Sequence, residues 1–158
     1  MTDWDAHIDL FYGSPAFDTS DPAGTVERMR RLLAVEHVDG PLAAFELAGV
    51  HDSLGMGREA ATLYREALGG GLDAEVAGRA RLQLASTLRA DGDYAAAIDL
   101  LREPVDEAHE GARAAFLALA LHDAGRGAEA LRTAIEALVP TLPRYRRSVA
   151  AYAAALAD

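Results

Sequence analysis

The feature that most constrains the fold is a repeated junction, in which a helix-forming run meets a glycine and a second helical run follows. The three junctions carry Gly55, Gly92 and Gly125. Subtraction of these residue numbers gives spacings of 37 and 33 residues, and such a period is typical of stacked helical pairs. Glycine suits each junction because it readily adopts the left-handed conformation that ends a helix. The sequence therefore predicts an array of helix-turn-helix units.

The remaining pattern is helical as well. Apolar residues recur at helical spacing from residue 26 onward and strand-like alternation is missing, so the predicted class is all-α. Pro104 should end or kink its helix, because proline lacks an amide donor and clashes with the preceding turn. The expected N-caps are Asp21, Asp73, Asp93 and Thr141. The expected helices span 23–37, 41–54, 57–68, 74–90, 94–102, 107–124, 127–139 and 143–157, with a further short helix over 3–12.

Around each glycine the residue types follow one order: a Leu-small pair, a large residue, the turn, a small residue and then an aromatic or another residue. The first copy has Leu47-Ala48, His51, Gly55, Ala60, Tyr64 and Ala67. The second has Leu84-Ala85, Leu88, Gly92, Ala97, Leu101 and Pro104, and the third has Leu117-Ala118, Leu121, Gly125, Ala130, Ala134 and Ala137. This order resembles the tetratricopeptide repeat family, whose period is 34 residues. The chain also resembles small bacterial members of uncharacterised role.

The resemblance implies a right-handed superhelical array of antiparallel helix pairs, with capping helices at both ends. Residues 1–21 carry five Asp and no Arg, so we expect an acidic N-terminal extension there, followed by a repeat domain over 22–158. The repeats are expected near 41–73, 78–110 and 111–142, before the helix at 143–157. Ala48, Ala85 and Ala118 should be buried between helices. Copy two should be irregular, because Pro104 replaces a small residue, and the usual early Trp is replaced in the three copies by Ala44, Arg81 and Ala114.

Composition excludes several functions. The net charge of -10 disfavours nucleic acid, because binding to phosphates requires clustered basic residues. The chain has no cysteine, and we find neither a signal peptide nor 18 consecutive apolar residues, so the expected location is the cytoplasm, without membrane contact. Lysine is absent, which excludes a P-loop. The expected protein is not an enzyme.

Three motifs have chemical interpretations that the repeat explains better. Residues 55–60 read G-x-G-x-x-A, but a dinucleotide site needs a strand before the glycines, and here a helix precedes them. His51-Asp52 and His122-Asp123 suggest a metal only if two separate repeats converge, which the packing distance between helices opposes. Asp91-Gly92-Asp93 is a turn followed by a cap. We therefore expect no cofactor and no metal.

The expected function is binding of a protein or peptide in the concave groove lined by the first helix of each pair. The groove residues predicted from helical spacing are Leu42, Phe45, Gly49, Asp52, Arg79, Leu82, Ser86, Arg89, Ala115, Leu119 and His122. Arg79 and Arg89 lie ten residues apart, close to three helical turns, and would select an acidic ligand. The alternative for these two side chains is neutralisation by neighbouring acids.

Other functions stay open. The last helix carries an apolar stripe of Tyr145, Val149, Tyr152 and Leu156, which would suit a homodimer or a larger self-assembly. Binding of a small molecule or metal is the third hypothesis. The aromatic residues of the N-terminal extension either fold back as a lid on the groove or stay free as a binding tail. These N-terminal residues are Trp4, Ile8, Phe11 and Phe17.

Overall fold

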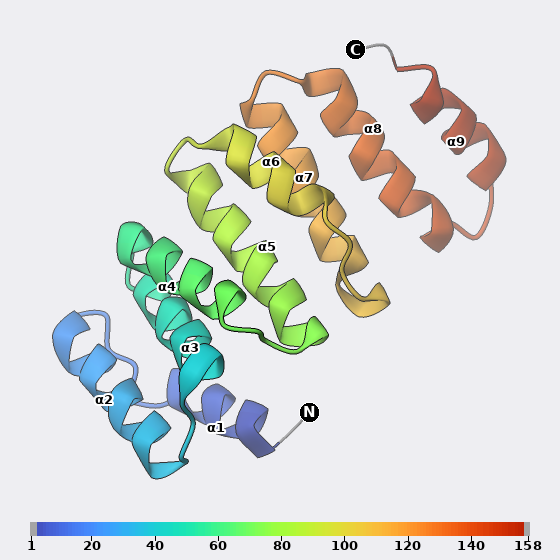
Figure 1. The fold of residues 1–158 in the computed structure, drawn as a ribbon. Coiled ribbons are helices and arrows are strands. Elements are labelled where there is room, and N and C mark those ends of the chain that lie inside the picture. Colours follow the sequence, from blue (N-terminus) through green and yellow to red (C-terminus); the bar gives the residue numbers. More distant parts are fainter. Residues whose placement is uncertain (1–2, 157–158) are drawn as a thin grey trace. The chain divides into compact units, whose positions relative to one another are not determined.

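The computed structural model describes residues 3–156, and every regular element in that range is helical (Figure 1). The chain forms two compact units, unit 1 over residues 1–72 and unit 2 over residues 73–158. Unit 1 contains α1 (Asp3–Tyr12), α2 (Pro22–Val35), α3 (Gly40–Ser53) and α4 (Gly57–Gly69). Unit 2 contains α5 (Ala74–Ala90), α6 (Tyr94–Arg102), η1 (Glu107–His109), α7 (Glu110–Asp123), α8 (Gly127–Leu138), η2 (Val139–Thr141) and α9 (Arg146–Ala154). The all-α prediction is confirmed.

The three junction glycines end helices as the repeat predicts. Gly55, Gly92 and Gly125 have φ angles of 75°, 87° and 77°, in the left-handed region where a side chain would be strained. After Gly55, the amide of Met56 donates to the carbonyl of His51 at 2.8 Å, and the same bond recurs after the other two glycines. This hydrogen bond satisfies a carbonyl that the end of the helix would leave unpaired. The repeated junction is therefore a repeated helix C-terminus.

Three of the four expected N-caps are confirmed. Asp21, Asp73 and Asp93 each accept a hydrogen bond from a backbone amide in the first turn of the following helix. The assignment of Thr141 is wrong: this residue lies in η2, and its hydroxyl donates to the carbonyl of Leu138. The last helix begins at Arg146 rather than near residue 143, because Tyr145 takes a left-handed φ of 67°. Residue 157, the expected end of that helix, lies outside the described residues.

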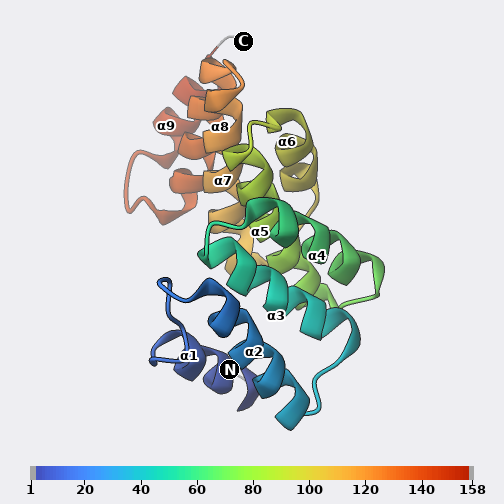
Figure 2. The ribbon, with the colours of Figure 1, turned by 90° about the vertical axis from the view of Figure 1, so that its left-hand side faces the viewer.

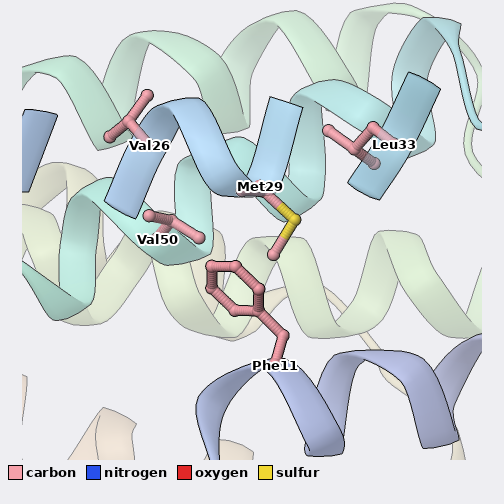
Figure 3. Packing of buried hydrophobic residues seen from close by; sticks show 5 residues of the cluster. All are labelled: Phe11, Val26, Met29, Leu33 and Val50. Atoms are coloured by element: carbon pink, nitrogen blue, oxygen red, sulfur yellow. The ribbon is translucent and has the colours of Figure 1, made fainter. Parts of the chain in front are cut away.

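Helix packing in unit 1 centres on α3, which contacts α2 on one side and α4 on another (Figures 1 and 2). The core beside α2 combines Val26, Met29 and Leu33 with Phe11 of α1 and Val50 of α3 (Figure 3). Burial of these side chains is the main term that holds the three helices together.

Packing in unit 2 runs in sequence order. Helix α5 contacts α6 and α7, while α7 contacts α8, and α8 contacts α9 (Figure 2). Helix α6 ends at Arg102, two residues before Pro104, and is shorter than its counterparts α4 and α8. The expected irregularity of copy two is therefore confirmed, with the proline as its physical cause.

Alanines mark the closest helix contacts. In unit 1, Ala48 of α3 is fully buried, as are Ala60 and Ala67 of α4. In unit 2, Ala85 of α5 and Ala97 of α6 are fully buried. Short side chains at these points let the paired helices approach closely and leave no room for a larger residue.

The third expected alanine differs from the other two. Ala118 is only half-buried, whereas Ala120 on the same helix is fully buried. The two residues lie two positions apart on α7, so their side chains lie on different faces of the helix, and only the face of Ala120 is fully covered. The prediction that Ala118 is buried was therefore wrong.

Substitution of these alanines by leucine tests the packing. Ala48→Leu and Ala85→Leu should each lower the free energy of unfolding by about 1 to 3 kcal/mol, because an overpacked site forces side chains off their rotamers. Ala118→Leu should cost less than either of these substitutions, because Ala118 is only half-buried. Urea denaturation followed by circular dichroism measures all three. Equal losses at positions 48 and 118 would contradict the helix contacts described.

Candidate ligand-binding surface

The expected groove residues of unit 2 lie on two helices in contact, α5 and α7. On α5, Arg79, Ser86 and Arg89 are half-buried, while Leu82 is 5% exposed and belongs to the core. On α7, the residues Ala115, Leu119 and His122 are exposed. Leu119 is a large apolar side chain that is 47% exposed.

The expected groove residues of unit 1 all lie on α3. Leu42, Gly49 and Asp52 are half-buried. Phe45 is 6% exposed, and its ring lies 6.1 Å from the ring of Tyr64 on α4. Because Phe45 fills the space between the two helices, it offers almost no surface to a ligand.

An ion pair joins α5 to α7. The guanidinium of Arg89 bonds the carboxylate of Asp123, and both side chains are 30% exposed. The Nε of Arg89 is buried and makes no hydrogen bond within the described residues. Arg89 is therefore neutralised by a neighbouring acid, which is the alternative that the sequence left open.

Asp123 is the residue that sequence reasoning missed, since it was considered only as half of a His-Asp pair. Its spacing carried the signal: Ala115, Leu119 and Asp123 are each four residues apart, so they form one row along α7. The row begins with small and apolar side chains and ends in the ion pair with Arg89. Unit 2 thus places an apolar surface next to a charged end.

The N-terminal segment folds back onto α3. The indole Nε1 of Trp4 donates to the Glu46 carboxylate at 2.8 Å. The Tyr12 hydroxyl lies so close to Gly49 that a Cβ there would come within 3.2 Å of its oxygen. The ring of Phe17 packs on that of Tyr12, with centroids 5.0 Å apart. Of the two expectations for this segment, the structure shows the packed form, with α1 against the Gly49 side of α3.

Two tyrosines near Glu46 and Asp52 titrate abnormally. Burial raises the pKa of Tyr12 to about 12, although a hydrogen bond with the Ser53 side chain acts in the opposite direction. Burial also raises the pKa of Tyr64, and the charge of Asp52 adds to this effect. Both phenols therefore stay neutral at physiological pH, and no phenolate nucleophile arises from them.

Other features of the described residues concern chemistry and membranes. The imidazole Nδ1 of the buried His51 donates to the Leu47 carbonyl at 2.7 Å, so its burial is compensated. No group of three or more His, Asp or Glu side chains in residues 3–156 is arranged to hold a metal ion. In the same range, no helix is both long and apolar enough to span a bilayer.

These observations define an all-helical repeat protein, built from helix pairs that end on left-handed glycines and pack through alanines. A family model described as tetratrico peptide repeat matches residues 41–156, which is well over half of the chain. The chain therefore belongs to the tetratricopeptide repeat family. Domains of this family generally mediate protein–protein interaction and are typically not catalytic. No curated protein matches the sequence.

Proposed function

We propose that the chain binds a segment of a partner protein along α5 and α7, as an interaction module without catalytic chemistry. The observation that supports this proposal is the row of side chains along α7, in which the exposed Leu119 lies one helical turn before the Arg89–Asp123 ion pair. Ala115 leaves space beside Leu119, and Ser86 on α5 supplies a hydroxyl. Such a surface suits a peptide that carries an apolar anchor followed by a polar or charged group.

The charge next to this anchor favours an acidic group on the ligand. Arg89 has a guanidinium, which binds carboxylates through paired hydrogen bonds. In the free protein Asp123 occupies it, so a ligand carboxylate competes with Asp123 for the same donors. Affinity then depends on the balance between two carboxylates and not on the arginine alone.

This competition predicts opposite effects for the two partners of the ion pair. Arg89→Gln should weaken binding of an apolar-acidic peptide by about tenfold or more, because the ligand carboxylate loses its guanidinium partner. Asp123→Asn should strengthen it, because Arg89 is released. Fluorescence anisotropy with the best binder from an array of such peptides measures both. Arg102→Gln, on the exposed part of α6, is the matched control.

Equal effects of these two substitutions on peptide affinity would contradict the proposal. If Arg89→Gln and Asp123→Asn both leave affinity at the level of the Arg102→Gln control, the ion pair lies outside the ligand site. If both weaken binding equally, the pair serves only to hold α5 against α7.

Self-assembly is the second candidate function, and exposed apolar residues near the C-terminus favour it. Tyr145 and Tyr152 are 76% and 74% exposed, and Leu131 and Leu138 on α8 are also exposed. Val149 and Leu156 of the expected stripe are half-buried, so the stripe is only partly available. A cluster of exposed apolar side chains of this kind is typical of interaction surfaces.

Sedimentation equilibrium tests this second candidate. Self-association through α9 predicts a mass that rises with protein concentration, and Tyr152→Glu should return the chain to a monomer because a charge is costly in an apolar interface. A parent chain that is monomeric at high concentration, or an oligomer that Tyr152→Glu leaves unchanged, would contradict self-assembly through α9.

A further inference from the structure

A cavity of about 320 Å³ lies in unit 1 between α1, the loop after it and α2, outside the part of the chain that the family model matches. Its apolar wall consists of Leu10 and Phe11 from α1, Ala16 from the loop and Leu32 from α2. Leu10 is 68% exposed at the edge of this cavity. A concave apolar surface of this volume, open to solvent on one side, can hold the apolar part of a small ligand.

The charged groups at this cavity are all basic. His7, Arg28 and Arg31 line it, and no carboxylate does, although the chain has a net charge of -10. Neighbouring acids stand outside the cavity: His7 meets Glu36 at 3.5 Å, and Arg31 meets Glu27 at 3.5 Å. A cavity with apolar walls and a basic edge is complementary to a molecule that has an apolar body and one anionic end.

Arg28 and Arg31 differ in how firmly the rest of unit 1 holds them. Arg28 is held in place, because its Nε donates to the Ala16 carbonyl at 2.7 Å and its terminal nitrogens bond Thr25 and Asp21. These bonds fasten the loop that carries Ala16 onto α2. Arg31 is much more exposed, and it meets Glu27 through Nε at a distance too long for a strong hydrogen bond. Arg31 is the guanidinium that can turn toward a ligand.

We propose that this cavity binds an aliphatic monocarboxylate of medium chain length. The hydrocarbon chain lies against Leu10, Ala16 and Leu32, and the carboxylate pairs with the terminal nitrogens of Arg31. Arg28 acts as a positioning residue, because its bond to the Ala16 carbonyl holds the loop that forms one wall of the cavity. The residues of this cavity belong to unit 1, whereas those of the peptide surface on α5 and α7 belong to unit 2.

The chain contains its own reporter for this binding. Trp4 is the single tryptophan, and its ring lies 6.3 Å from the ring of His7, which lines the cavity. The experiment titrates the full chain with hexanoate, octanoate and decanoate below their micellar concentrations and follows tryptophan fluorescence. Each added CH₂ should tighten binding about fourfold while the chain fits. Neutral 1-octanol should bind at least about tenfold more weakly than octanoate.

Variants localise the ligand. Arg31→Gln should weaken octanoate binding about tenfold, whereas Arg30→Gln should leave it unchanged, because Arg30 is exposed on the same helix and does not line the cavity. Ala16→Phe should fill the cavity and abolish binding, while circular dichroism shows that the helices are retained. If Ala16→Phe disturbs the helices, the comparison of Arg31→Gln with Arg30→Gln tests the proposal by itself.

Four results would overturn the proposal. They are the absence of saturable binding by any of the three acids, an affinity that is independent of chain length, equal affinity for octanoate and 1-octanol, and equal effects of Arg31→Gln and Arg30→Gln. A tetrapeptide with a C-terminal leucine that binds more tightly than octanoate would also overturn it, since the occupant would then be a protein terminus.

Discussion

The close approach of paired helices at alanine is the contact on which the rest of the structure depends. Ala48, Ala60 and Ala67 in unit 1, and Ala85 and Ala97 in unit 2, are fully buried at these contacts. A helix that packs through methyl groups brings its backbone near its partner, so the dispersion contacts of both helices are maximised. The same contact fixes the rotation of each helix. On α5 the face that carries the buried Ala85 also carries Leu82, three residues earlier, which is buried as well.

Local signals made most of the fold predictable from sequence. Junction glycines require only a positive φ, and aspartate caps require only a nearby amide, so neither depends on distant residues. Prediction failed where tertiary contact decides. The backbone at Tyr145 is left-handed although the residue is not glycine, and no propensity indicates that the last helix begins after it. Ala118 matches the repeat in sequence, but its exposure depends on which face of α7 the neighbouring helices cover.

The candidate site was predictable in its helices and less so in its details. Helical spacing indicated Ala115 and Leu119 on α7 but could not show that Phe45 turns toward Tyr64 or that Asp123 neutralises Arg89. Those are contacts between helices, which a single sequence does not reveal. The cavity beside α1 was missed for a similar reason. It exists because an irregular loop separates α1 from α2, and Arg28 holds that loop in place.

Site-specific photo-cross-linking tests most directly whether a partner protein lies along α5 and α7. A benzophenone amino acid is introduced at Ser86 or Ala115 on these helices, and at Asp99 on α6 or Glu136 on α8 as matched exposed controls. If α5 and α7 carry the binding surface, positions 86 and 115 form the same adduct, and an excess of unlabelled protein removes it. Adducts that form from positions 99 and 136, with none from 86 and 115, would contradict this placement.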